Sequence, residues 1–292
     1  MIKSKLTKFW DWVIVIVCFG VILTCILPIL NLLAQSLSSP LAIVNRKVAF
    51  LPVETTFESY RYVFRDPSFS RSMGWTAILT VICTLVSLGI TILCAYPLTY
   101  DSLKGRNFVN TFIIFTMYFG AGTIPTYIWM KDLHLLNNPL VLIIPNCLSV
   151  FNMIILRSFF YSVPLALRES AELDGANPFT VLLNVYLPLS GPVLATLALF
   201  YAVGRWNGFS DALLYLTQPD FHPIQLKLYN IINNLSSIEV ATQEGIAGGG
   251  APQASEGMKA AAVMIATIPI VVVYPWLQRY FIAGVSVGAV KG

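Results

Sequence analysis

The sequence predicts an all-α membrane protein that crosses the bilayer six times. Of its 292 residues, 57% are hydrophobic and only 11% are charged, whereas charged residues make up about 25% of an ordinary soluble domain. Six uncharged runs come close to the roughly 20 residues that a helix needs to cross a hydrocarbon core of about 30 Å. Each run is predicted to be helical, because lipid offers its backbone no other hydrogen-bond partners. The runs are Val13–Ala34, Ser72–Tyr96, Phe108–Met130, Pro139–Leu156, Pro188–Gly204 and Ala260–Leu277.

The first run is predicted to stay in the protein as an anchor. It follows Lys3, Lys5 and Lys8, and Ala34-Gln35-Ser36 after it is similar to a signal-peptidase site. The run is longer than the usual 7–15 residues of a signal-peptide core, so we do not expect cleavage.

The basic N-terminus also orients the predicted spans. Positive charges beside a first span favour the cytoplasmic side, and six spans bring the C-terminus back to that side. The basic residues of the loops divide equally between the two sides. The short Asp101–Asn107 loop, with Lys104 and Arg106, therefore supplies the remaining support. Both termini are expected to be cytoplasmic.

Between the fourth and fifth runs, acidic and helix-interrupting residues break the hydrophobic pattern. The stretch from Glu169 to Pro188 is ESAELDGANPFTVLLNVYLP. Within residues 161–188 we expect two short helices that meet at a corner marked by Gly175. Asn177 followed by Pro178 favours a helix start, because Asn accepts hydrogen bonds from exposed amides and Pro fits the first helical position. The stretch is predicted to dock a partner.

These residues resemble the cytoplasmic signature loop of ABC importer permeases. That family's pattern is Glu-Ala-Ala, three residues, Gly, nine residues, then Ile-x-Leu-Pro. Ser170 replaces the first Ala of the pattern, and Val185 replaces the Ile. The matching positions are Glu169, Ala171, Gly175, Leu187 and Pro188.

The resemblance implies that this coupling-helix loop docks in a groove of an ATP-hydrolysing subunit. The sequence contains no G-x-x-x-x-G-K-[ST] phosphate loop, so ATP and Mg are expected on separate ATPase subunits. The chain itself is expected to be non-catalytic and to bind no cofactor. The coupling residues that the resemblance implies are Glu169, Ala171, Glu172, Asp174, Gly175 and Pro188.

The resemblance extends from Thr56 to the C-terminus and is to the maltose-type sugar-permease branch. It divides the chain into residues 1–55, with the first span, and a transport core over residues 56–292. It implies a bacterial inner-membrane complex with a second homologous permease, two ATPases and an extracytoplasmic solute-binding protein, and no nucleic-acid partner. Within the branch, the sequence is most similar to permeases for polysaccharide-derived oligosaccharides, some of them acidic fragments of alginate or pectin.

Polar and aromatic residues deep in the spans are candidates for the substrate path, because aromatic faces, amides and hydroxyls hold sugars. For each residue taken singly, contact between helices is the slightly favoured explanation. Asn146 is the preferred candidate, since it follows Pro145, where a broken helix also frees carbonyls. Arg205 either meets an acidic sugar or reaches the outer interface. The candidates are Tyr118, Tyr127, Trp129, Asn146 and Asn152.

The external loops are predicted at Gln35–Arg71, Lys131–Asn138 and Arg205–Lys259. The first contains an amphipathic pattern that begins near Thr56, a possible cap, and is typical of a helix at the membrane surface. The last contains a glycine-rich tip at Gly245–Gln253. Either this tip is a simple connection, or Gly248, Gly249 and Gly250 contact the binding protein.

The alternative functions are an ion-driven secondary transporter and a membrane enzyme. Coupled transporters commonly place ionisable groups within their spans, and an enzyme needs converging acids, bases or metal ligands. The predicted spans contain no His, Asp or Glu. The five cysteines lie in hydrophobic runs without a CxxC pair, so we expect them to pack as apolar residues and to bind no metal.

Overall fold

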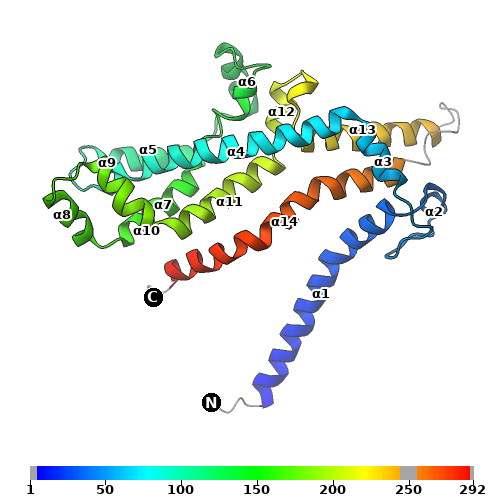
Figure 1. Cartoon of the computed structure of the whole chain (residues 1–292), viewed down its shortest axis with the longest axis horizontal. Helices are drawn as coiled ribbons and strands as arrows, with labels where there is room; N and C mark the ends of the chain where they lie inside the picture. The colour runs from blue at the N-terminus through cyan, green and yellow to red at the C-terminus, as the bar shows by residue number, and fades with distance from the viewer. Residues whose placement is uncertain (1–4, 244–254, 290–292) are drawn as a thin grey trace. The chain divides into compact units, whose positions relative to one another are not determined.

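The computed structural model describes residues 5–243 and 255–289, with side chains at residues 9–234 and 256–275. Every regular element in this part of the chain is helical (Figure 1). The chain forms two compact units, one of Met1–Ser70 with Lys227–Ile268 and one of Arg71–Leu226 with Pro269–Gly292. The predicted all-α membrane fold is confirmed.

Three of the predicted spans are single helices. Among the described residues these are α1 (Lys5–Ser36), α4 (Pro67–Ala95) and α14 (Ser255–Ala289). Their apolar stretches, long enough to cross a bilayer, are Phe9–Ser36, Pro67–Thr99 and Glu256–Pro275.

Three helical pairs with sharp bends cover the remaining predicted spans. The helix α5 (Arg106–Tyr118) meets α6 (Thr123–Asp132) at 115°, and α7 (Val150–Ser162) meets α8 (Leu165–Leu173) at 74°. The stretch Pro178–Leu189 meets α11 (Gly191–Asn207) at 84°. The first bend falls inside the predicted Phe108–Met130 run, the second between the predicted fourth span and the Gly175 corner, and the third near the start of the predicted Pro188–Gly204 run.

Local backbone chemistry explains two of the interruptions in the predicted spans. Gly122 has a φ of +85°, which few other residues adopt, and it separates α5 from α6. The predicted fourth span, Pro139–Leu156, starts with one short turn, η2 (Pro139–Leu142), and an irregular segment that contains Pro145. The helix begins only at Val150, where the hydroxyl of Ser149 accepts a hydrogen bond from the Asn152 amide at 3.4 Å.

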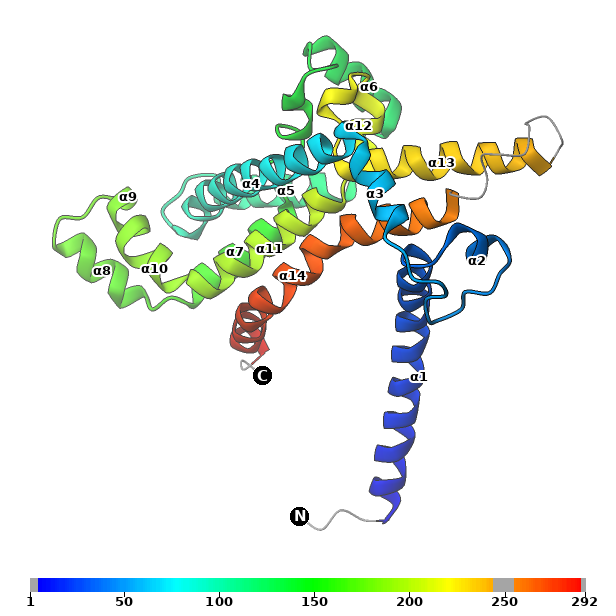
Figure 2. The same ribbon diagram turned by 45° about the vertical axis from the view of Figure 1, so that its right-hand side comes forward.

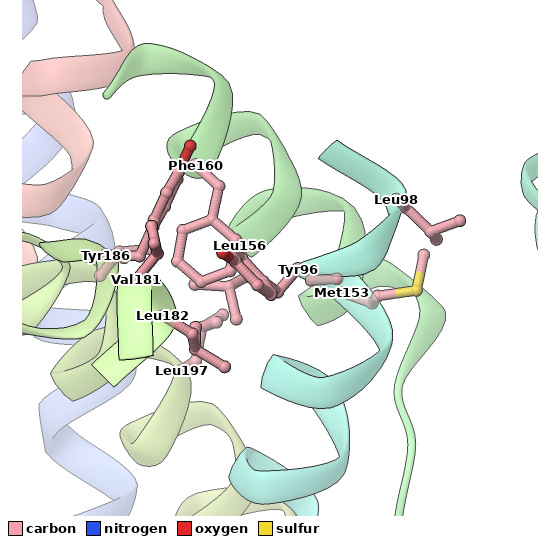
Figure 3. Close-up of a cluster of buried hydrophobic side chains, with 11 residues drawn as sticks. Tyr96, Leu98, Met153, Leu156, Phe160, Val181, Leu182, Tyr186 and Leu197 are labelled. Atoms are coloured by element: carbon pink, nitrogen blue, oxygen red, sulfur yellow. The ribbon is translucent and has the colours of Figure 1, made fainter. Parts of the chain in front are cut away.

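An aromatic core holds the second unit together at one end (Figure 3). The rings of Tyr96, Phe160 and Tyr186 pack edge to face, with centroids 5.1, 5.3 and 6.2 Å apart. Aliphatic side chains from α4, α7 and α11 surround them. The buried members of this core are Ala95, Tyr96, Leu98, Met153, Leu156, Phe160, Val181, Leu182, Tyr186, Val193 and Leu197.

The helix α12 (Ser210–Tyr215) lies at the other end of α11 from α8 and α9 (Figures 1 and 2). The ring of Tyr127, on α6, stacks on that of Tyr215 at 5.9 Å. The side-chain oxygen of Asn137 accepts hydrogen bonds from the amide and the hydroxyl of Thr217, both at 2.7 Å. These contacts tie α6 and α12 together.

In the first unit, α3 (Glu58–Arg65) forms where the surface helix was predicted. The hydroxyl of Thr56 accepts a hydrogen bond from the Glu58 amide at 3.2 Å, although the cap residue itself is Phe57. Ser59 is buried against the first turn of α14, where a Cβ on Gly257 would lie 2.7 Å from its hydroxyl. The close approach therefore requires glycine at position 257.

An ion pair joins the start of α4 to α13 (Ile224–Gln243) in the same unit: Lys227 Nζ lies 3.0 Å from Asp66. Burial raises the pKa of Asp66, but hydrogen bonds from Ser68 and Lys227 and the lysine charge lower it by more. The net result is a pKa below the ordinary value, so the stability that the ionised pair contributes is present at neutral pH and is lost only as the pH falls through that lowered pKa.

The predicted Arg205–Lys259 loop is largely helical. It contains α12, a short turn η4 (Pro219–Phe221) and the 20-residue α13. The predicted glycine-rich contact at Gly248, Gly249 and Gly250 lies outside the described residues.

Candidate coupling loop and substrate cavity

The predicted corner of the coupling loop is a glycine-dependent helix end. Gly175 has a φ of +86°. Its amide donates to the Glu172 carbonyl at 3.1 Å, and the Ala176 amide donates to the Ala171 carbonyl at 2.9 Å. This pair of bonds is the Schellman motif, which satisfies the last carbonyls of a helix and favours glycine at the left-handed position. The spacing from Ala171 to Gly175 in the signature therefore terminates α8.

The next helix begins as the sequence predicts. The side-chain oxygen of Asn177 accepts a hydrogen bond from the Thr180 amide at 2.8 Å. Pro178 takes the first position of α9 (Pro178–Val181), where it needs no donor. The capped end of α8 and the capped start of α9 fix the direction of the chain on both sides of Gly175.

The tip of this loop presents apolar and acidic side chains together. Leu173 is 89% exposed and Phe179 is also exposed. Glu169, Glu172 and Asp174 lie on the same exposed stretch. An exposed leucine flanked by carboxylates is complementary to a partner surface that has an apolar pocket surrounded by basic groups.

The base of the loop is joined to the end of α4. The Tyr96 hydroxyl donates to the Pro178 carbonyl at 2.9 Å, so it accepts from the Tyr100 hydroxyl, which lies 2.6 Å away. The guanidinium of Arg168, on α8, lies over the Tyr100 ring at 4.5 Å, and its Nε is 3.5 Å from Glu172. A displacement of α8 therefore acts directly on the end of a span.

The signature's Leu-Pro pair shapes the entry to the fifth span. Pro188 cannot donate to the carbonyl four residues before it, and the preceding turn, η3 (Leu182–Tyr186), is wide, with the Leu187 amide bonded to the Leu182 carbonyl. Ser190 is fully buried at the 84° bend, and its hydroxyl donates to the Tyr186 carbonyl at 2.6 Å. The buried hydroxyl of Ser190 at the bend therefore has a hydrogen-bond acceptor.

A cavity of about 640 Å³ lies in the second unit, beside the C-terminal end of α11. Amides, hydroxyls and aromatic rings line most of it. The lining residues that carry this chemistry are Ser87, Asn146, Ser149, Phe151, Asn152, Phe200, Tyr201, Arg205, Ser210 and Asp211.

The cavity contains a buried ion pair that the sequence did not indicate. Arg205 is only 8% exposed, and its terminal nitrogens lie 2.5 and 3.0 Å from the two carboxylate oxygens of Asp211. They also donate to the carbonyls of Leu142 at 3.2 Å and Gly208 at 2.9 Å. This geometry rules out the predicted alternative in which Arg205 extends to the interface, because its hydrogen-bonding partners hold it inside the protein.

The structure brings some of the predicted substrate contacts together and leaves others apart. Asn146 and Asn152 both line the cavity, and Asn146 Nδ2 lies 3.4 Å from Asp211. Tyr118, Tyr127 and Trp129 are not among its lining residues. Their role in the substrate path stays a prediction.

Sequence reasoning missed three residues of these sites. Arg168 stands directly before the signature, and its stacking on Tyr100 depends on a contact between distant parts of the chain. Leu173 lies inside the signature, where an isolated leucine between acids was a usable signal. The ion-pair partner of Arg205, Asp211, lies six residues further on, in what the sequence indicated as an external loop.

The helical membrane fold and the loop that carries the permease signature indicate a transmembrane subunit of a transporter. The family model described as "Binding-protein-dependent transport system inner membrane component" matches residues 88–287. The chain belongs to this family.

Several individual proteins are similar along nearly their whole length. Protein LplC of Bacillus subtilis (strain 168) is 40% identical, over 100% of this chain and 98% of the relative. The polygalacturonan/rhamnogalacturonan transport system permease protein YtcP of the same strain is 37% identical, over 92% of this chain and 94% of the relative.

A solved structure has the same fold. It is the crystal structure of a bacterial ABC transporter involved in the import of the acidic polysaccharide alginate. The TM-score is 0.87 at 31% sequence identity, with 96% of this chain and 99% of that chain covered.

Proposed function

We propose that this chain forms half of the translocation pathway of an importer for oligosaccharides released from a larger polysaccharide. A second, homologous permease supplies the other half, two ATPase subunits bind and hydrolyse ATP with Mg, and an extracytoplasmic binding protein delivers the sugar. The chain itself performs no catalysis. Relatives named for polygalacturonan/rhamnogalacturonan, arabinooligosaccharide and trehalose/maltose transport support the substrate class.

The observation that carries the coupling role is the loop between α8 and α9. Its tip is exposed and acidic, and its base is part of the aromatic core with Tyr96, Phe160 and Tyr186. Movement of a partner bound to the tip is therefore transmitted to the aromatic core, because the base of the loop is packed into that core. ATP-driven closure of the ATPases would reach the spans by this route.

The cavity lined by Asn146 and Asn152 supports the substrate role. Amide side chains offer both donors and acceptors, and the rings of Phe151, Phe200 and Tyr201 add faces on which a sugar can stack. The volume of about 640 Å³ is within the usual range for small-molecule sites.

We place both termini and the loop between α8 and α9 on the cytoplasmic side, with α12 and the loop that follows α6 outside. The basic residues near the first span and in the Asp101–Asn107 loop support this orientation. A docked ATPase also requires the Gly175 corner to be cytoplasmic.

Cysteine labelling tests orientation and docking together. In a background without the native cysteines, Leu173→Cys and Ser102→Cys are expected to react with an impermeant thiol reagent only in inverted vesicles. Asp132→Cys, on α6, is expected to react only in intact cells. Addition of the ATPase subunits should slow the labelling of Leu173→Cys at least tenfold, because the docked groove covers the tip, and leave Ser102→Cys reactive.

Two outcomes would contradict the proposal. Labelling of Leu173→Cys in intact cells would show that the loop between α8 and α9 is external, the opposite of the proposed orientation. Equal labelling rates with and without bound ATPase would place the docking surface elsewhere on the chain. Asp132→Cys serves as the control for vesicle sidedness in both experiments.

A further inference from the structure

The cavity beside α11 has an arginine but no net charge. Arg205 and Asp211 are the charged residues among those that line it, and they form an ion pair. The side chains are 7% and 16% exposed, so solvent screens the pair little. Asp211 occupies both terminal nitrogens of the guanidinium, the position in which a carboxylate binds an arginine most strongly.

The pair also leaves one buried donor without an acceptor. Four hydrogen bonds from the terminal nitrogens of Arg205 go to Leu142, Gly208 and the two oxygens of Asp211. The Nε–H of Arg205 is buried and has no partner among the described residues. The four hydrogens of the terminal nitrogens are all used within the protein, so the guanidinium has no terminal donor left for a sugar carboxylate.

We propose that this cavity binds an uncharged, hydroxyl-rich sugar unit, and that Asp211 makes the site select against carboxylated sugars by neutralising Arg205. The inference rests on the proposed function, and it names the chemistry of the sugar that this subunit accepts. Asn146 and Asn152 supply hydrogen bonds to hydroxyls, while Phe200 and Tyr201 supply the apolar faces.

A carboxylated sugar meets two obstacles in this site. With Asp211 in place, its carboxylate lies beside a buried charge of the same sign, which is strongly unfavourable. If the carboxylate displaces Asp211 from the guanidinium, Asp211 is left buried without its counter-charge. A neutral sugar avoids both costs, because it leaves the ion pair intact.

A matched pair of trisaccharides tests this selectivity. Trigalacturonate and its carboxyl-reduced counterpart differ only in charge and carboxyl oxygen. Their dissociation constants are measured by equilibrium dialysis on the full complex of both permeases and the ATPases in nanodiscs, without the binding protein. The neutral sugar is expected to bind at least tenfold more tightly to the wild-type complex.

Two variants should reverse the preference. Asp211→Asn frees the charge of Arg205, and Ser210→Lys adds a positive charge from an exposed position that tolerates a longer side chain. Each is expected to shift the ratio of the two dissociation constants at least tenfold towards trigalacturonate. The double variant Arg205→Gln/Asp211→Asn should give a ratio between those of the wild type and Asp211→Asn, because it has neither the repelling carboxylate nor the free guanidinium. Asp220→Asn is the control, because it removes an acidic charge that is exposed and outside the cavity.

The outcomes separate this inference from the proposed function. If the complex imports oligosaccharides with its binding protein and the cavity variants leave the ratio unchanged, the inference is wrong and the proposed function stands. If no oligosaccharide is imported, the proposed function fails. If Asp211→Asn is too unstable to purify, the wild-type ratio decides, because tighter binding of trigalacturonate to the wild-type complex would overturn the inference.

Discussion

Gly175→Val is expected to cut ATP-driven uptake at least tenfold while the chain still inserts in the membrane. No atom stands within 4 Å of a Cβ built on Gly175, so the cause is the backbone and not a collision. A β-branched residue pays roughly 1–2 kcal/mol or more in the left-handed conformation. The motif that ends α8 then opens, and the tip no longer meets the ATPase groove. The measurement is uptake into proteoliposomes, with co-purification of the ATPase subunits as a second readout.

Gly175→Asn is the matched control, because asparagine adopts the left-handed conformation more readily than other side chains of its size. It is expected to retain most of the uptake. Wild-type uptake and ATPase association in Gly175→Val would show that the corner is not needed for coupling.

Phe160→Ala is expected to reduce the free energy of unfolding by about 3–5 kcal/mol. Phe160 is 1% exposed and contacts both Tyr96 and Tyr186 edge to face, so its removal leaves a cavity where α4, α7 and the loop base meet. In a unit of this size, that loss corresponds to a fall in Tm of roughly 10 °C. Thermal unfolding of the purified complex in detergent measures it.

Phe112→Ala is the control, since Phe112 is an exposed side chain of α5. Its Tm is expected to change by only a few degrees. A Tm for Phe160→Ala that equals the wild-type value would mean that the aromatic core does not hold the coupling loop to the spans.

Sequence patterns predicted the class of fold and the coupling loop because both depend on local chemistry. Length and apolarity define a span, and the left-handed turn at Gly175 and the cap at Asn177 involve residues within a few positions of each other. Such features can be recognised without knowledge of the tertiary structure.

The bends and the cavity depend on information that hydropathy does not contain. The Phe108–Met130 run contains no charged residue, yet the chain bends by 115° between α5 and α6, beside Gly122. Hydropathy indicates that a segment lies in the membrane, but it does not determine the direction of the chain. The irregular segment around Pro145 also falls within a predicted span, since it contains no charged residue. The sequence predicted a broken helix at Pro145, but it did not predict that the next helix would begin only at Val150.

The Arg205–Asp211 pair shows a second limit. Asp211 reads as a loop residue, and only the fold returns it to the end of α11, where it neutralises the arginine. The stacking of Arg168 on Tyr100 is equally non-local. Pairs of this kind decide the electrostatics of a site, and they follow from packing between distant parts of the chain.

The central claim is that this chain imports an oligosaccharide with energy from a separate ATPase. The direct measurement is uptake of a labelled trisaccharide by proteoliposomes that contain both permeases and the ATPases. The account predicts uptake only when the binding protein is outside and ATP with Mg is inside, and its loss in Glu169→Lys, which reverses a charge on the docking loop. Uptake driven by a proton or sodium gradient without ATP would contradict the account and favour an ion-driven secondary transporter.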